Sequence, residues 1–161
     1  MKKILLVAIA LFAICITVSA VSADEGWSFS FGSESNSDGG SININNNELK
    51  IQDEKFTIPE GYKEVEKERI VANNSALVEG AKVSTCVLQN GNSTIYVQVH
   101  FADGGVHNIT GPENSVNKTI GGHNGFLSNE SDGDSVFDFG VNDKLVEIIA
   151  PTEADIEAVL K

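Results

Sequence analysis

The sequence predicts an α+β, mostly β domain, in which an antiparallel sheet built from hairpins carries a C-terminal helix packed on it. Three observations support this prediction. From Ser41 onward, apolar and polar residues alternate in short runs. Turn signals of two residues, such as Asn-Gly and Asp-Gly, separate these runs. Only the last ten residues combine a helix-capping residue with an apolar helical stripe, which suits a helix that covers one face of the sheet.

The first hairpin is expected in "SININNNELKIQ", around a two-residue loop at Asn46-Asn47. This loop gives two aliphatic cross-strand pairs on one face: Ile44 with Leu49, and Ile42 with Ile51. The next segment, "KFTIPEGY", predicts a short strand that Pro59 ends and Gly61 turns. Residues 63–80 show no clean helical stripe, so an edge strand leading into a loop or a short helix is expected there.

A long hairpin is predicted in "KVSTCVLQNGNSTIYVQVHF". A loop at Asn90-Gly91 would set Cys86 opposite Ile95, whereas a loop at Gly91-Asn92 would change the partners. Both choices leave Cys86 on the apolar face, because they differ by an even number of positions. Cys86 is therefore expected to be buried and inert.

The last hairpin is predicted in "SVFDFGVNDKLVEIIAP", with its turn at Asn142-Asp143. The expected apolar pairs are Phe139 with Val146 and Phe137 with Ile148. In the closing "TEADIEAVLK", Thr152 is a helix N-cap residue and an apolar stripe follows it.

The N-terminus has the pattern of an export signal. Lys2 and Lys3 precede an uncharged run from residue 4 to residue 23 that ends in small residues, so cleavage is expected after Ala23. A retained signal-anchor is the alternative, because the run is almost long enough to span a membrane. Either way residues 1–23 direct the chain out of the cytoplasm, to a secreted or cell-surface location.

Residues 24–40 are rich in Ser and Gly and are expected to form a flexible leader before a single domain at residues 41–161. Trp27, Phe29 and Phe31 alternate with serines in this leader, which suits a strand, a tether or an aromatic strip for a partner.

The exported part carries all 23 acidic residues but nine of the eleven basic ones, so its formal charge is 9 − 23 = −14. Such a surface repels phosphate and anionic lipid, so nucleic acid and membrane surfaces are not expected as partners beyond the possible anchor. Five N-x-[ST] sequons suggest N-glycosylation of a surface protein. Their asparagines are Asn73, Asn92, Asn108, Asn117 and Asn129.

The segments at residues 56–64, 118–126 and 137–160 resemble small exported proteins of methanogenic archaea, a family without an assigned molecular function. An F-x-I-P-x-G-aromatic opening followed by a sheet and a closing helix is also faintly similar to PsbP-like domains. These resemblances imply an α+β fold and an extracytoplasmic place, and N-glycosylation in archaea would fit the sequons. They say little about function.

A speculative metal site comes from "FADGGVH". A hairpin loop at Asp103-Gly104 would set His100 opposite His107, close enough to share a metal ion with His123 or a carboxylate as third ligand. A loop at Gly104-Gly105 would break this pairing. No metal and no cofactor are therefore the expectation.

No catalytic motif is present. The stretch "KTIGGHNGFLSNESDGDS" lacks the spacing of a phosphate loop or a calcium loop, and two turns explain its glycines, with weak calcium binding as the alternative. Asp138 and Glu147 fall opposite each other in the last hairpin and are expected to be exposed, although a buried pair could act as acid and base.

The function expected is a non-enzymatic binding or accessory module with an unknown envelope glycan or protein as partner. The alternative is a metal-dependent or hydrolytic extracytoplasmic enzyme with a dispersed site. A deep pocket with convergent polar groups would favour the enzyme, and an open sheet face or groove would favour the module.

Overall fold

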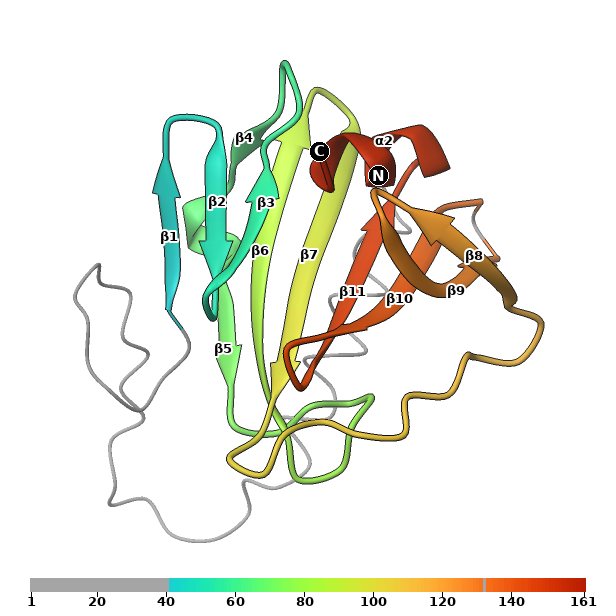
Figure 1. The fold of residues 1–161 in the computed structure, drawn as a ribbon. Coiled ribbons are helices and arrows are strands. Elements are labelled where there is room, and N and C mark those ends of the chain that lie inside the picture. Colours follow the sequence, from blue (N-terminus) through green and yellow to red (C-terminus); the bar gives the residue numbers. More distant parts are fainter. Residues whose placement is uncertain (1–40, 132) are drawn as a thin grey trace, which may run out of the picture. The chain divides into compact units, whose positions relative to one another are not determined.

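The computed structural model describes residues 41–131 and 133–161 (Figure 1). It confirms the fold class, because antiparallel strands dominate and a C-terminal helix closes the chain. The predicted signal segment at 1–23 and the leader at 24–40, with Trp27, Phe29 and Phe31, lie outside the described residues.

A small sheet comes first, with strands in the order β1-β2-β3. These strands are β1 (Ile42–Asn45), β2 (Glu48–Ile51) and β3 (Glu54–Thr57). The predicted hairpin register is confirmed, with Ile44 opposite Leu49 and Ile42 opposite Ile51. Tyr62 donates its backbone N–H to the Pro59 carbonyl (3.1 Å), which makes the predicted turn at Gly61.

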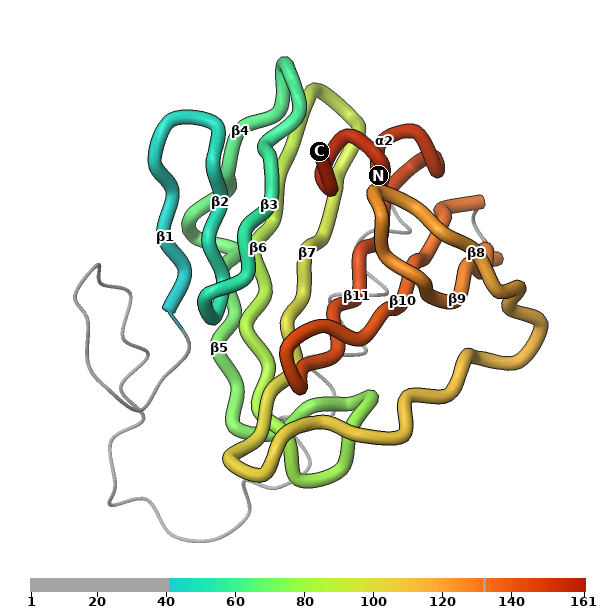
Figure 2. The backbone as a smooth tube through the Cα atoms, viewed as in Figure 1, coloured from blue at the N-terminus to red at the C-terminus, as the bar shows by residue number. Residues whose placement is uncertain are grey.

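The large sheet has the order β4-β6-β7-β11-β10-β9-β8, and β5 also pairs with β6 (Figure 2). Its strands are β4 (Lys63–Glu64), β5 (Ile70–Ala72), β6 (Lys82–Asn90), β7 (Ser93–Phe101), β8 (Val116–Ile120), β9 (His123–Asn129), β10 (Ser135–Val141) and β11 (Lys144–Ala150). A 3-10 turn, η1 (Glu66–Glu68), lies between β4 and β5. The region at 63–80 thus contains both the edge strand and the short helical turn that were expected.

The β6–β7 hairpin takes the second of its two possible registers. Asn90 pairs with Ser93, so Gly91-Asn92 forms the loop and Cys86 lies opposite Val97, not opposite Ile95. Gly91 has a φ of +59° and occupies the first loop position, where a type II′ turn requires glycine. The faces keep their assignment, because the two registers differ by two residues.

The β10–β11 hairpin has the predicted register, with Phe139 opposite Val146 and Phe137 opposite Ile148. Both loop residues, Asn142 (φ 47°) and Asp143 (φ 58°), are left-handed, as a type I′ turn requires. Helix α2 (Glu153–Val159) follows, and the Thr152 hydroxyl accepts from the Asp155 backbone N–H (3.2 Å), which confirms the predicted cap.

The main core lies between the small sheet, one face of the large sheet and α2. Leu49 and Phe56 from the small sheet, Phe137 and Ile148 from the large sheet, and Ile156 from α2 belong to this cluster. A smaller apolar cluster forms at one end of the opposite face. There Leu145 of β11 packs with Ala81 and Val106 from the long connections.

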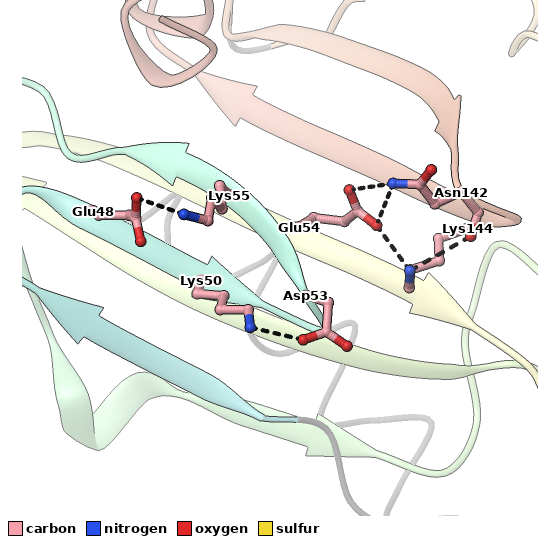
Figure 3. A network of polar contacts seen from close by, with 7 residues as sticks. All are labelled: Glu48, Lys50, Asp53, Glu54, Lys55, Asn142 and Lys144. Carbon is pink, nitrogen blue, oxygen red and sulfur yellow. Dashed lines mark hydrogen bonds and ion pairs between the residues drawn. The ribbon is translucent and has the colours of Figure 1, made fainter.

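A polar contact joins the two sheets at their rim. Glu54 at the start of β3 is 8% exposed, and both of its oxygens accept from the Asn142 amide (3.2 and 3.1 Å). The Lys144 ammonium donates to the same carboxylate (2.8 Å), as Figure 3 shows. The turn of the last hairpin is thereby tied to the first hairpins of the chain.

We expect Glu54→Ala to lower the free energy of unfolding by about 2 kcal/mol, because it leaves the Asn142 amide and the Lys144 ammonium without their shared acceptor. Glu48→Ala is the matched control, since Glu48 pairs with Lys55 in an exposed ion pair (51% and 65% side-chain exposure). Its loss should cost about 0.5 kcal/mol or less. Equal losses in urea denaturation would contradict the role given to Glu54.

Candidate functional site

The second face of the large sheet, opposite the main core, carries an unbroken row of non-aliphatic side chains. Side chains alternate between the two faces along a strand, so the pairing of neighbouring strands determines which residues lie side by side on this face. The row crosses β6, β7, β11, β10, β9 and β8 as Thr85, Gln98, Glu147, Asp138, Phe126 and Asn117. We call these six residues the polar row.

Hydrogen bonds run along half of the polar row toward one carboxyl group. The Thr85 hydroxyl donates to the Gln98 side-chain carbonyl (3.2 Å), and the Gln98 amide donates to Glu147 Oε2 (2.5 Å). Thr85 and Gln98 are 3% and 8% exposed. The Thr85 hydroxyl and the Gln98 amide are thus held in fixed orientations beside Glu147.

Asp138 is the least satisfied member of the polar row. It is 5% exposed, and its Oδ1 has no hydrogen-bond partner in the described part of the chain. The sequence placed Asp138 opposite Glu147 correctly, but the expectation that both are exposed was wrong: Asp138 is buried and Glu147 is partly buried. The alternation of apolar and polar residues predicts on which face of the sheet a side chain lies. It does not predict how deeply the connections between strands bury that face.

Both carboxyl groups of the pair are shifted toward their neutral forms. Burial raises the pKa of Glu147 to about 8, with repulsion from Asp138 and Glu130 adding to it and the Gln98 hydrogen bond opposing it. Burial raises the pKa of Asp138 to about 6. Near neutral pH the pair therefore carries about one negative charge and holds one proton.

One end of the polar row opens onto a shallow depression of about 530 Å³ on the β8–β9 hairpin. Asn117 and Phe126 belong to both the row and the depression. The depression is lined by Asn117, Lys118, Thr119, Asn124, Gly125 and Phe126. An aromatic ring beside amides and a carboxylate pair offers apolar contact and hydrogen bonds together, as small-molecule and side-chain binding surfaces do.

The two-histidine metal proposal was wrong in its geometry. The segment after Phe101 forms no strand up to Ser115, and the Val106 backbone N–H bonds to the Asp143 carbonyl (2.7 Å) instead of closing a hairpin. His100 is buried on β7, whereas His107 is exposed and hydrogen-bonded to the Gly104 carbonyl (3.0 Å). In residues 41–131 and 133–161 no three His, Cys, Asp or Glu side chains form a metal-binding group.

A Ser-His contact that sequence reasoning missed lies near the polar row. His100 Nδ1 lies 2.8 Å from the Ser75 hydroxyl, which also accepts from the backbone N–H groups of Leu77 (3.1 Å) and Val78 (2.9 Å). The hydroxyl oxygen is thus occupied as an acceptor and donates its proton to His100. A hydroxyl that donates to a histidine is the first contact of a nucleophile–base pair, but no third group orients His100 here, because its Nε2 has no hydrogen-bond partner among the described residues. The contact fixes the turn after β5.

Burial lowers the pKa of His100 to about 4, so the ring is neutral at pH 7. Its Nε2 has no hydrogen-bond partner among the described residues. No spacing in the sequence connects Ser75 with His100, because the contact depends on how the connection after β5 folds back over the sheet.

Cys86 is fully buried, as predicted, with its Sγ 3.5 Å from the Glu64 carboxylate. Burial, followed by the Glu64 charge, raises the pKa of this thiol far above its ordinary value. Arg69 pairs with the same carboxylate through two guanidinium nitrogens, one at 2.7 Å. Cys86 therefore does not supply a nucleophile.

The stretch at 118–135 contains two turns, as predicted, but Gly125 lies within β9 and not in a turn. Gly121 and Gly122 join β8 to β9, and the backbone hydrogen bond from Gly133 to Glu130 (3.1 Å) closes the turn before β10. A side chain at Gly121 would come within 2.3 Å of Leu160, so glycine is required there for packing as well as for its φ of +56°. His123 lies against the Phe139 ring (4.4 Å between centroids).

All five sequon asparagines are exposed. Asn92 lies in the β6–β7 loop, Asn117 on the edge strand β8 and Asn129 at the end of β9. Asn73 and Asn108 lie on the two long connections. Each position is accessible to modification.

Comparison with protein-family models, with curated proteins and with solved structures found no match. The resemblance to exported proteins of methanogenic archaea therefore stays a prediction. Within the described residues, no helix is long and apolar enough to cross a membrane.

We expect stability to fall as the pH rises from 6.5 to 8. The folded pKa of Glu147, about 8, lies above its ordinary value of 4.5, so the folded state binds a proton that the unfolded chain has released. That stability is present at low pH and is lost as the pH rises through 8. The predicted range begins at pH 6.5 because His100 has the opposite effect below it. Its lowered pKa makes stability rise with pH between about 4 and 6.5.

Urea denaturation at several pH values measures this slope, and Glu147→Gln should flatten it while keeping an acceptor for Gln98. Glu60→Gln, which removes an exposed carboxylate, should leave the slope unchanged. Identical slopes in all three proteins would show that Glu147 is ionised normally.

Proposed function

We propose that this chain is an exported cell-envelope or extracellular domain that binds a partner, without catalysing a reaction, through the polar row and the adjoining depression. The single observation that carries this proposal is Asp138 Oδ1, a buried atom beside Glu147 in the middle of a sheet face that has no hydrogen-bond partner in the described part of the chain. A buried polar group without a partner costs about 1–3 kcal/mol, so a sheet that only had to fold would gain from an apolar residue there.

The shape of the face supports a binding module. The depression beside Phe126 is open and shallow, and a side chain or a sugar can lie across it without entering a cleft. Binding faces of this kind combine an aromatic anchor with oriented amides and carboxylates. Phe126, Asn117, Gln98 and Glu147 supply these groups on one row.

Export is supported by the N-terminal signal pattern, by the acidic composition and by the exposed sequons. The partner is then a component met outside the cytoplasm, and an envelope glycan or protein is the class proposed. N-glycans on the exposed sequon asparagines other than Asn117, which lines the depression, would make the chain a glycoprotein.

A hydrolytic activity is the second candidate, and the carboxyl pair is the observation that favours it. Asp138 and Glu147 are cross-strand neighbours with different raised pKa values, and such pairs serve as acid and base in hydrolases. The open depression offers little to enclose a substrate, so binding is preferred over this reading.

The proposal predicts saturable retention of the purified mature chain on native cell-envelope material. Phe126→Ala and Asp138→Asn should each weaken retention at least about tenfold, since truncating an interface anchor typically costs more than 1 kcal/mol. Leu77→Ala is the matched control, because Leu77 is an exposed apolar side chain (52%) that belongs neither to the polar row nor to the lining of the depression.

Equal retention of all four proteins would contradict the proposal. Release of soluble envelope fragments by the wild type but not by Glu147→Gln would favour the hydrolytic candidate instead.

A further inference from the structure

Among the residues that the structure describes, no recorded ion pair joins a cation to Asp138 or Glu147. In the described part of the chain, the ion pairs of Lys and Arg engage other carboxylates, among them Glu54, Glu64 and Glu153. Asp138 Oδ1 is buried and has no hydrogen-bond donor. A buried acceptor of this kind calls for an explanation, and an absent ligand is one.

The surroundings of Asp138 are apolar on its own face. Val136 precedes it by two positions on β10 and is 4% exposed, and Phe126 lies opposite it on β9. Leu145 and Ile149 flank Glu147 on β11 by the same alternation. Apart from Gln98, which donates to Glu147, these strand neighbours of the two carboxyl groups are aliphatic or aromatic.

Phe126 connects the depression with the carboxyl pair. Phe126 lines the open depression and is the direct neighbour of Asp138, and adjacent strands lie about 4.8 Å apart. A group on an apolar stem could pass along Phe126 and reach the carboxylate. A lysine side chain has a four-carbon stem that packs on apolar surface and ends in three hydrogen-bond donors.

We propose that the Asp138–Glu147 pair binds a primary ammonium group on an apolar stem, namely the lysine side chain of a partner protein. This proposal rests on the proposed function. The ammonium donates to Asp138 Oδ1 and to Glu147, and the stem lies against Phe126. The two carboxyl groups alone give too few ligands for a metal ion, since no third metal-binding side chain among residues 41–131 and 133–161 joins them. The acidic surface steers such a cation toward the face.

Binding of the cation displaces the proton that the pair holds, so at pH 7 the free and bound states differ by up to one proton. Glu130 is the further carboxylate whose charge acts on Glu147, and it strengthens the attraction for the cation. The groups beside the pair on β7 are the neutral Gln98 and Tyr96. No described cation competes for the site through a recorded ion pair.

The test titrates the purified mature chain with Nα-acetyl-lysine methylamide and follows the side-chain carboxyl ¹³C signals of Asp138 and Glu147 by NMR. The matched probe is the same compound with its side-chain amine acetylated, which keeps the stem and removes the charge. We expect saturable shifts with the amine at millimolar concentration, release of protons into weak buffer, and at least tenfold weaker binding of the acetylated probe.

Asp138→Asn and Glu147→Gln should each weaken amine binding at least fivefold, whereas Glu60→Gln, which removes the same charge from an exposed site, should change it less than twofold. Equal binding to the wild type and both row variants, or to both probes, would overturn the proposal. Tighter binding of glucosamine than of the lysine analogue would overturn the assignment to a lysine side chain.

The two proposals can fail separately. Envelope retention that depends on Asp138 without any amine binding would leave the binding function standing and refute the ammonium site. Loss of both would refute the polar row as a binding face.

Discussion

The pairing register of β10 with β11 is the constraint on which the rest of the structure depends. It places Phe137 and Phe139 in the core together with Val146 and Ile148. By the same alternation it places Asp138 opposite Glu147 on the second face. A slip of one residue in either strand would turn that strand's carboxyl group into the main core and two of these four apolar side chains out of it. The left-handed Asn142 and Asp143 fix that register locally, and the contact of Glu54 with Asn142 ties it to the first hairpins.

The two faces of the large sheet therefore serve different purposes. The core face is apolar and packs against the small sheet and α2. The second face is covered at one end by the long connections and carries the polar row in its middle. Two buried atoms without partners, Asp138 Oδ1 and His100 Nε2, lie on this face. Unsatisfied polar groups often lie at functional sites, which is why we propose this face for binding.

Much of the fold could be predicted from the sequence, because hairpins are local. Turn residues and period-two patterns gave the strands, the β1–β2 and β10–β11 registers, the cap at Thr152 and the buried face of Cys86. The β6–β7 register stayed open because Asn-Gly-Asn offers two loops of similar quality. The predicted hairpin at Asp103-Gly104 was wrong because residues 102–115 gain more by packing Val106 and Ile109 beside Leu145 than by pairing with β7. The burial of Asp138 and the contact of Ser75 with His100 depend on long connections, which no local pattern specifies.

The central claim is that Asp138 and Glu147 form a carboxyl pair that holds a proton near neutral pH. A ¹³C NMR titration of their side-chain carboxyl carbons, in the absence of any ligand, tests it most directly. The account predicts two apparent midpoints near 6 and 8, both well above the ordinary values of 3.8 and 4.5, with one of them abolished in Glu147→Gln. Midpoints below 5 for both residues would show two ordinary exposed carboxylates and would contradict the account.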